Sequence, residues 1–427
     1  MSASSGLGTK TGVYRRYVLG MLLAVYLVSL VDRQILAVLL EPIRHDLGLH
    51  DVQLGLLSGV AFGLLYAVVA VPLSRLGDRR SRVGVIAGSL VVWSLATALC
   101  GAAAGFGQLF AARVLVGTGE AGAGPSSHSL IADYFPPERR GFALGVYSMG
   151  IFMGAGLGLS LGGVLLMAWG WRGAFVAAGL PGLLLAVLLG VTVRDPRRSD
   201  ATVRAPAFGE SVRIVTRAGP LLSGAFGLGF SVFAIQSMLN WLPALLARDY
   251  AFSPSQAGHA LAPVVALFGT AGVLAGGLAC DRVGRHAPAN SPLLMAAVTF
   301  LIVPAGIFGL LSGSARVLIA SQAPVFFCSA FVAGPSFALF QARTPPALRA
   351  FAAAFAGLVA VILGNAAGPF AAGALSDILR ATGSAHPLRD GLIACNAAAA
   401  IGSCAYLAAA RTLAQQAPDG VVDVTLS

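Results

Sequence analysis

Residues 123–126 read Ala-Gly-Pro-Ser, and residues 333–336 repeat the same four letters 210 positions later. Shortly after the first copy comes Pro-Pro-Glu-Arg-Arg at 136–140, and shortly after the second comes Pro-Pro-Ala-Leu-Arg at 345–349, an offset of 209. Two landmarks at nearly one offset are hard to obtain by chance. The chain therefore consists of two halves that repeat each other.

A charged loop and a set of glycines extend this repeat. Residues 74–82 read Ser-Arg-Leu-Gly-Asp-Arg-Arg-Ser-Arg, and residues 277–285 read Gly-Leu-Ala-Cys-Asp-Arg-Val-Gly-Arg, 203 positions later. The first copy has Ser74 and Ser81 where the second copy has glycine. The glycines that recur at an offset of 210 are Gly154, Gly158, Gly364 and Gly368. A duplicated helical half is typical of transporters whose two halves rock about a central site.

The composition excludes a soluble domain. Of the 427 residues, 57% are hydrophobic and only 11% are charged, whereas a soluble domain carries about 25% charged residues. Such an apolar chain is also unlike a disordered protein. The first apolar run continues well past the ~7–15 residues of a signal peptide, so we expect a retained membrane span. The five cysteines lie in apolar stretches without metal-ligand spacing, and we interpret them as small core residues.

A bilayer core needs about 20 apolar residues per helix, and dividing the chain at its charged and Pro/Gly-rich clusters gives segments of that length. The predicted spans are 16–39, 52–76, 83–104, 107–133, 140–168, 171–193, 220–246, 255–279, 291–313, 316–341, 348–376 and 390–411. We therefore predict an all-α integral membrane protein with twelve transmembrane helices in two pseudo-symmetric six-helix bundles.

Lys and Arg residues set the orientation, because positively charged loops stay in the cytoplasm. With the N-terminus inside, the cytoplasmic segments hold 20 basic residues and the opposite side holds 6. We expect both termini in the cytoplasm and the protein in the plasma membrane, which in a bacterium is the inner membrane. The longest connection, 194–219, separates an N-terminal bundle (1–193) from a C-terminal bundle and tail (220–427). Topology thus explains the net charge of +11, and no nucleic acid partner is expected.

Four charged residues lie deep in the predicted spans: Asp32 and Arg33 in the first, and Arg113 and Glu120 in the fourth. A charge at the bilayer centre costs at least ~2.5 kcal/mol, so these groups must be paired or must face water. Arg113 and Glu120 are seven residues apart and share a helix face, whereas adjacent Asp32 and Arg33 diverge by about 100°. Protonation of either carboxylate leaves a net positive cavity that favours an anion. The alternative is that the four charges only hold two helices together.

The second half has no equivalent of this charge set. At the offset of 210, Ala323 matches Arg113 and Ala330 matches Glu120. We therefore expect ion coupling to belong to the N-terminal half.

Polar and aromatic residues on other spans are candidates for the substrate-binding surface, although each could equally serve helix packing. They are Tyr26, Tyr147, Phe233, Gln236, Asn240, Trp241 and Gln322. His128 is either a proton relay or a capped polar residue near the cytoplasmic mouth. The Gly-x-Gly-x-x-Gly pattern at 117–122 does not follow a strand, so it does not indicate a dinucleotide site. We expect no cofactor and no metal.

The pattern at 277–285 resembles the loop motif of the major facilitator superfamily. In that family the loop locks one conformational state. A glycine in it lets helices approach, its aspartate can lie at a helix N-terminus, and its arginines hold the cytoplasmic face. The residues that carry the resemblance are Asp78, Arg79, Arg82, Gly277, Asp281, Arg282, Gly284 and Arg285.

Within that superfamily, the runs at 30–36, 53–59, 78–82 and 113–129 resemble the Spinster-like family. The resemblance implies export or exchange of lipid-like molecules such as lysophospholipids. It matches Asp32 to a protonatable carboxylate on helix 1, with Arg33 beside it, and it matches Arg113 and Glu120 to a pair on helix 4. An antiporter-type glycine motif is also present on helix 5, but Leu159 replaces its proline.

The organic anion:cation symporter family is the alternative, since its helix 4 also resembles Arg113, Glu120 and the stretch 135–140. The sequence thus predicts a proton-coupled secondary transporter of a small organic or lipid-like anion, acting as a monomer by alternating access. In this hypothesis Asp32 accepts the proton, Glu120 and Arg113 gate and balance charge, and Arg33 contacts the anion or the gate. A membrane enzyme or a non-transporting receptor would need a catalytic or soluble constellation that the sequence does not contain.

Overall fold

The computed structural model describes residues 5–79, 81–196, 219–285, 287, 289–344 and 348–415, and the regular structure in these ranges is helical. Ten of the described helices are long and apolar enough to cross a membrane. Contacts divide the chain into two compact units.

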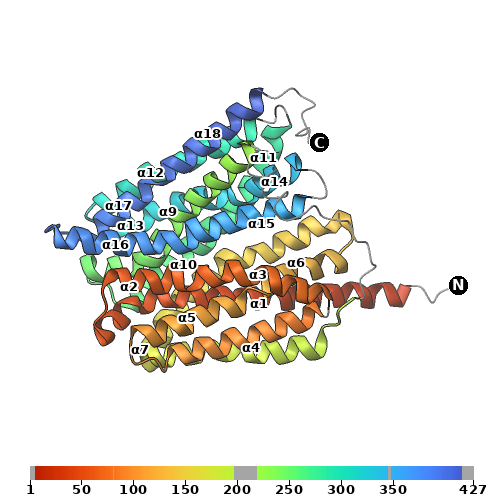
Figure 1. The fold of residues 1–427 in the computed structure, drawn as a ribbon, viewed down its shortest axis with the longest axis horizontal. Helices are drawn as coiled ribbons and strands as arrows, with labels where there is room; N and C mark the ends of the chain where they lie inside the picture. Colours follow the sequence, from red (N-terminus) through yellow and green to blue (C-terminus); the bar gives the residue numbers. More distant parts are fainter. Residues whose placement is uncertain are drawn as a thin grey trace. The chain divides into compact units, whose positions relative to one another are not determined.

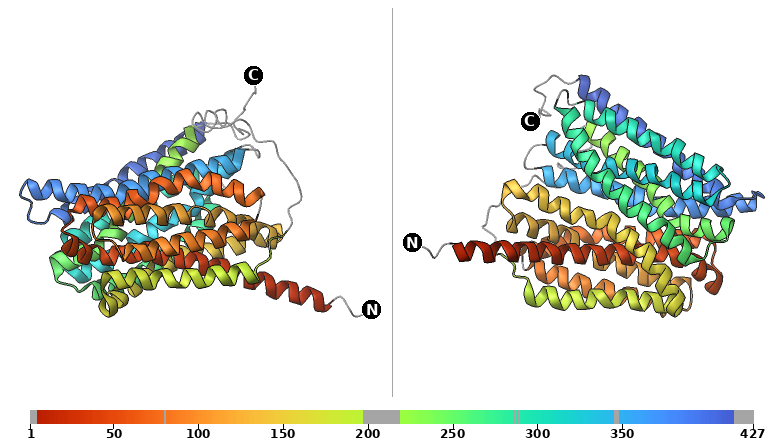
Figure 2. Two further views of the ribbon diagram at one scale, coloured as in Figure 1. Left: turned by 60° about the horizontal axis from the view of Figure 1, so that its bottom comes forward. Right: turned by 180° about the vertical axis from the view of Figure 1, so that it is seen from behind.

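The first unit contains the described residues of Met1–Leu49, Ala61–Ser199 and Ser253–Ala262. Its helices are α1 (Ser5–Leu47), α3 (Ala61–Arg79), α4 (Arg82–Cys100), α5 (Phe106–Glu120), α6 (Ala123–Tyr134), α7 (Pro137–Thr192) and most of α10 (Pro254–Pro263). The long helix α7 packs along α1 and α4, which the red-to-yellow-green ribbons of Figure 1 and the two views of Figure 2 allow the reader to follow.

The second unit contains the described residues of His50–Val60, Asp200–Phe252 and Pro263–Ser427. Its elements are α2 (Asp51–Gly55), η1 (Leu56–Val60), α9 (Gly219–Tyr250), η2 (Val264–Phe268), α11 (Gly269–Gly284), α12 (Asn290–Leu311), α13 (Ala315–Phe331), α14 (Ala333–Arg343), α15 (Arg349–Val359), η4 (Ala360–Ala366), α16 (Ala367–Ala381), α17 (Pro387–Ala397) and α18 (Ala399–Gln415). The units therefore differ from a simple division at the linker, because one short segment from each half of the sequence packs in the other unit. Of that linker, residues 197–218 lie outside the described part of the chain.

The ten candidate spans are consistent with the twelve predicted from the sequence. Helix α7 covers two predicted spans, and Gly170 between them has a left-handed backbone conformation (φ 66°) that separates two helices. The predicted span 107–133 corresponds to α5 and α6, which are each too short to be counted alone.

The repeated Ala-Gly-Pro-Ser stretch marks the same interruption in both halves. Proline has no N–H to donate, and its ring clashes with the carbonyl four residues earlier, so it fits best in the first turn of a helix. Pro125 stands in the first turn of α6, and α5 ends just before it at Glu120. Likewise Pro335 stands in the first turn of α14, and α13 ends at Phe331. The duplication seen in the sequence is thus a duplication of local structure.

The repeated glycines make equivalent helix contacts in the two units. A Cβ on Gly154 would lie 2.7 Å from Leu30 Cβ of α1, and one on Gly158 would lie 2.9 Å from Gln34 Cβ. In the second unit a Cβ on Gly368 would lie 2.7 Å from the carbonyl oxygen of Phe233 in α9. Small residues at such positions let membrane helices approach closely. Gly154 and Gly158 thus allow α7 to pack against the part of α1 that carries the buried charges.

Candidate functional site

The four charged residues predicted to lie deep in the protein all belong to the first unit. Asp32 and Arg33 lie on α1, and Arg113 and Glu120 lie on α5. Asp32, Arg113 and Glu120 are at most 2% exposed, whereas the Arg33 side chain is 26% exposed. Arg33 is therefore the one member of this set that a ligand could reach directly.

Arg33 and Glu120 form an ion pair through a single carboxylate oxygen. The Nε and Nη2 atoms of Arg33 lie 2.7 and 2.6 Å from Glu120 Oε2. The hydroxyl of Ser29, one turn earlier on α1, donates to the same oxygen at 2.7 Å. Within the described part of the chain, Glu120 Oε1 has no hydrogen-bond partner. These hydrogen bonds from α1 to the Glu120 carboxylate of α5 thus all end on one oxygen, Oε2.

Asp32 and Arg113 are buried without a direct hydrogen bond between them. Thr97 of α4 donates weakly to Asp32 Oδ2 at 3.5 Å. Among the described residues, Asp32 Oδ1 and the Nε and Nη1 atoms of Arg113 have no hydrogen-bond partner. Asp32 still lies within electrostatic range of both Glu120 and Arg113. Glu120 forms its ion pair with Arg33. The seven-residue spacing puts Glu120 and Arg113 on one face of the helix, but they do not form an ion pair.

Aromatic rings surround the exposed guanidinium. The Arg33 Cζ atom lies 4.1 Å from the centroid of Phe62 and 5.5 Å from that of Tyr66. Such cation–π contacts hold the guanidinium plane in place. Neither aromatic residue was singled out in the sequence, although their spacing of four places them on one helix face, which is a signal that could have been used.

Two of the tentative substrate residues meet in the first unit. Tyr26 and Tyr147 stack with ring centroids 4.6 Å apart and planes 6° apart. The exposed ring of His128 contacts Tyr147 edge-on at 5.2 Å. His128 therefore extends the aromatic surface formed by Tyr26 and Tyr147.

The remaining tentative residues lie in the second unit and bond to their own helices or neighbours. Trp241 is fully buried and donates from Nε1 to the carbonyl of Pro369 at 2.9 Å. Gln322 is also buried and donates to the carbonyl of Leu318 at 3.2 Å. Asn240 is 6% exposed and donates to Gln236 O, and Phe233 is partly exposed. Trp241 thus serves helix packing in this structure.

In the first copy of the charged loop, Arg82 is described, and the side chains of Asp78 and Arg79 lie outside the described part of the chain. Arg82 is buried at the start of α4 and contacts Asp133 at 2.5 Å and Asp195 at 2.7 Å. It also donates to Ser129 Oγ at 3.0 Å. Arg82 thus ties α4 to the ends of α6 and α7. The contribution of Asp195 was not foreseen from the sequence.

In the second copy, Asp281, Arg282 and Arg285 are exposed at the end of α11, where Gly284 is partly exposed. A Cβ on Gly277 would meet no described atom within 4 Å. The close helix approach expected of Gly277 occurs one position earlier, where Gly276 packs against the backbone of Phe331.

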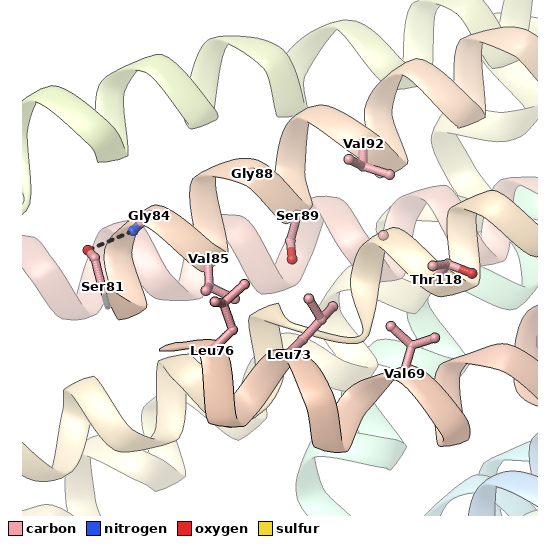
Figure 3. A pocket seen from close by; sticks show the side chains of 11 residues that line it. Val69, Leu73, Leu76, Ser81, Gly84, Val85, Gly88, Ser89, Val92 and Thr118 are labelled. Atoms are coloured by element: carbon pink, nitrogen blue, oxygen red, sulfur yellow. Dashed lines mark hydrogen bonds between the residues drawn. The ribbon is translucent and has the colours of Figure 1, made fainter. Parts of the chain in front are cut away.

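A separate groove of about 480 Å³ lies between α3, α4 and α5 (Figure 3). Val69 and Leu73 of α3 point toward α4, and Val92 at its edge is 46% exposed. Its described lining is mostly apolar and includes the hydroxyl groups of Ser81, Ser89 and Thr118.

The family model of the Major Facilitator Superfamily matches residues 22–369. An "MFS-type efflux pump" of Mycolicibacterium smegmatis is 32% identical over 92% of this chain and 92% of the relative. A "Probable L-galactonate transporter" of Escherichia coli is 26% identical over 89% of this chain and 86% of the relative.

The solved structure of a bacterial homolog to the human lysosomal transporter Spinster, in an inward-facing and unoccupied conformation, has a TM-score of 0.82 with 28% identity. The alignment covers 95% of this chain and 99% of that one. The resemblance to the superfamily and to Spinster proteins expected from the loop motif and from the helix 1 and helix 4 residues is confirmed. The chain belongs to the Major Facilitator Superfamily, with Spinster proteins among its homologues, and is a membrane transporter, not an enzyme.

Proposed function

We propose that the protein is a proton-coupled secondary transporter that moves a small organic or lipid-like anion by alternating access. The observation that carries this proposal is the Arg33–Glu120 pair. Its guanidinium is reachable and framed by Phe62 and Tyr66, whereas its carboxylate is 2% exposed. Arg33 binds the anion, and the aromatic rings contact the apolar body of the substrate.

Anion binding and proton binding are linked through Glu120. An anion that takes over the Arg33 guanidinium displaces Glu120 Oε2, which keeps only the hydrogen bond from Ser29. An unpaired buried carboxylate in the membrane interior costs several kcal/mol. Glu120 therefore takes up a proton when the anion binds, and a protonated Glu120 in turn favours the anion.

Asp32 is the second proton acceptor in this scheme, beside Arg113. Its Oδ1 atom has no hydrogen-bond partner among the described residues. Two nitrogens of Arg113 also have none among these residues. A proton on Asp32 leaves the charge of Arg113 unopposed and raises the positive potential of the site. Arg113 thus balances the charge of whichever carboxylate is ionised.

Export is favoured by the name of one relative, the efflux pump of Mycolicibacterium smegmatis. The alternative is import by anion:proton symport, as the name of the Escherichia coli relative suggests for a sugar acid. The contact through Glu120 Oε2 favours this alternative, because binding of the anion promotes binding of the proton. Export driven by an inward proton gradient would instead require the anion and the proton to compete for the site.

Flux in proteoliposomes tests the coupling. The protein is reconstituted with an internal pH dye, and an inward proton gradient is imposed. Either a hexonate or a lysophospholipid is placed outside to follow uptake, or inside to follow export. We expect Asp32→Asn to lose gradient-driven flux, while the control Asp46→Asn, on an exposed ion pair with Arg172, keeps it. Full gradient-driven flux in Asp32→Asn would show that Asp32 is not a coupling residue.

The same vesicles decide the direction of coupling. Without an imposed gradient, addition of a transported anion acidifies the lumen if proton and anion move together, and makes it alkaline if they exchange. Acidification supports symport, and alkalinisation supports an exporter of the Spinster type.

A further inference from the structure

Two glycines of the Gly-x-Gly-x-x-Gly pattern shape the groove between α3, α4 and α5. A Cβ on Gly117 would collide with the carbonyl oxygen of Phe62 in α3, and one on Gly119 would lie 2.7 Å from the backbone nitrogen of Trp93 in α4. Both helices therefore pack directly on the backbone of α5, and they contact α5 more extensively than they contact each other. A groove remains between α3 and α4, and α5 contributes its floor.

Two further glycines keep the α4 wall of this groove open. A Cβ on Gly88 would meet no described atom within 4 Å, and one on Gly84 would meet only the side chain of Ser81. The groove volume of about 480 Å³ falls in the ~300–1,000 Å³ range of ligand pockets. Most of the lining side chains are aliphatic, namely Val69, Leu73, Leu76, Val85 and Val92 (Figure 3).

The hydroxyl groups of the lining are largely satisfied by the protein itself. Ser81 Oγ accepts a hydrogen bond from the backbone nitrogen of Gly84 at 3.0 Å, and Thr118 Oγ1 donates to the carbonyl of Val114 at 2.8 Å. Ser89 is only 7% exposed. A water molecule needs about two to four polar partners to stay in a cavity. The described lining therefore favours hydrocarbon over water.

The open side of the groove continues the outer surface of α4. Helix α4 is one of the candidate membrane spans, and Val92 at the edge of the groove is exposed together with its neighbours Val91 and Leu95. On α3, Leu76 is exposed as well. At the depth of a membrane span the surrounding medium is lipid hydrocarbon. A lipid chain can thus enter the groove from the side.

The groove has the length and the charge of a site for one lipid leaflet. From Ser81 to Val92 its α4 wall extends about 16 Å at ~1.5 Å per residue, which is about half of the ~30 Å hydrocarbon core. Ser81 belongs to the charged loop 74–82, which the predicted topology places in the cytoplasm. Apart from Arg82, which pairs with two aspartates, this loop holds three arginines and one aspartate. Basic residues next to a membrane span attract anionic headgroups.

We propose that the groove binds one acyl chain of an anionic phospholipid from the cytoplasmic leaflet. The headgroup lies at the loop 74–82, and the end of the chain lies near Val92 and Thr118. Because three helices surround this chain, the lipid exchanges more slowly than the lipids around the protein. The groove lies entirely within the first unit, and its lipid is distinct from the transported anion of the proposed function.

Photo-crosslinking in nanodiscs tests both the occupant and its direction. Two phosphatidylglycerols are used, with a diazirine either near the ester or near the end of one acyl chain, and the labelled peptides are mapped by mass spectrometry. We expect the first lipid to label the protein around Gly84 and the second to label it around Val92 and Thr118. Even labelling of the exposed faces of α4 and α7, or the reverse order in the groove, would overturn the proposal.

Gly88→Phe fills the groove. Because a Cβ at this position meets no described atom within 4 Å, the ring can extend into the space of the chain. We expect crosslinking in the groove to fall by about tenfold or more. Gly190→Phe on α7 is the matched control, since Gly190 is also exposed and equally free of neighbours, and it should leave the labelling unchanged. Gly88→Leu makes a smaller change and decides if Gly88→Phe does not fold. Equal crosslinking in the folded variant and the parent would count against the site.

Lipid retention and competition identify the occupant further. Native mass spectrometry of detergent-purified protein should show one more retained phosphatidylglycerol on the parent than on Gly88→Phe. Unlabelled phosphatidylglycerol should displace the photolipid better than phosphatidylcholine with the same chains, and equal displacement would refute the anionic headgroup. Disulfide-linked dimers of Gly88→Cys in place of lipid crosslinks would show that a second copy covers the groove. These measurements use no proton gradient, so failure of proton coupling would leave their result intact.

Discussion

Arg33 and Glu120 meet through one oxygen, and this geometry makes the pair easy to exchange. A guanidinium that binds a carboxylate through both oxygens holds it more rigidly. Here two nitrogens of Arg33 and the hydroxyl of Ser29 all converge on Oε2, which leaves Oε1 free of hydrogen bonds among the described residues. A pair of this kind holds helices together at rest and can release its arginine to a ligand.

Glu120→Gln should uncouple proton movement from anion movement. The amide keeps the shape of the side chain but cannot be ionised, so anion binding to Arg33 no longer requires a proton. We expect gradient-driven uptake to fall by about tenfold or more, while exchange of labelled for unlabelled anion across the membrane continues. The control is Glu41→Gln, at the Arg44 pair elsewhere on α1. Full uptake with an unchanged pH profile in Glu120→Gln would contradict the assignment.

Arg33→Lys should weaken anion binding although the charge is kept. Lysine cannot place two nitrogens on one acceptor in a fixed plane, and it loses the guanidinium contact with Phe62. We expect the apparent KM for a transported anion to rise by about tenfold, which corresponds to ~1.4 kcal/mol. Arg44→Lys, the matched change at an ion pair away from the site, should leave KM unaltered. Equal KM values in the two variants would argue against Arg33 as the anion contact.

Helices α1 and α7 pack closely because α7 has glycines, which lack side chains, where the two helices meet. Gly154 and Gly158 let the α1 backbone approach at the level of the buried charges. In a membrane, where lipid is as apolar as leucine, close backbone packing replaces the hydrophobic effect as a source of stability. The position of Asp32 and Arg33 therefore depends on glycines of another helix.

Gly154→Ala should lower the thermal stability of the purified protein. Its Cβ would lie 2.7 Å from Leu30 Cβ, so α1 must shift, at a cost of about 1–3 kcal/mol. Gly145→Ala on the same helix is the control, since its Cβ would meet no described atom within 4 Å. We expect a lower Tm for the first variant and an equal or higher Tm for the second. The reverse order would refute the packing argument.

Arg82 joins three helix ends at the start of α4. Its side chain is 4% exposed and contacts both Asp133 and Asp195. We expect Arg82→Gln to destabilise the protein by about 3–5 kcal/mol, as when a buried ion pair loses one partner, and to lower Tm accordingly. Arg139→Gln changes an exposed arginine six residues after Asp133 and should have little effect. Equal Tm values would mean that the cluster adds no net stability.

The distribution of basic residues predicts which side of the membrane the two termini face. With 20 of them assigned to one side and 6 to the other, both termini should face the cytoplasm. Green fluorescent protein fused to either end should fluoresce in bacterial cells, and alkaline phosphatase fused there should be inactive. Phosphatase activity at both ends would invert the proposed topology.

The sequence by itself determined the class of the protein, its duplication and the position of its spans. Hydrophobic runs act through local rules, so they predict the spans directly from the chain. The helix breaks before Pro125 and Pro335 lie inside the predicted spans 107–133 and 316–341, and only the structure revealed them. The predicted span 140–168, for example, stops next to Gly170, where the structure separates two helices. The sequence also identified the four residues buried deep in the first unit, because a charge inside an apolar run is visible without a structure.

Only the tertiary structure decided which of these charges meet. Helical spacing put Arg113 on the same helix face as Glu120. In the folded protein the ion-pair partner of Glu120 is instead Arg33 of another helix, which also contacts Phe62 and Tyr66. Asp51 likewise pairs with Arg248 and Arg380, which lie more than 190 positions away in the chain. Pairing between helices depends on how they pack in three dimensions, whereas periodicity along one helix gives only the face on which a residue lies.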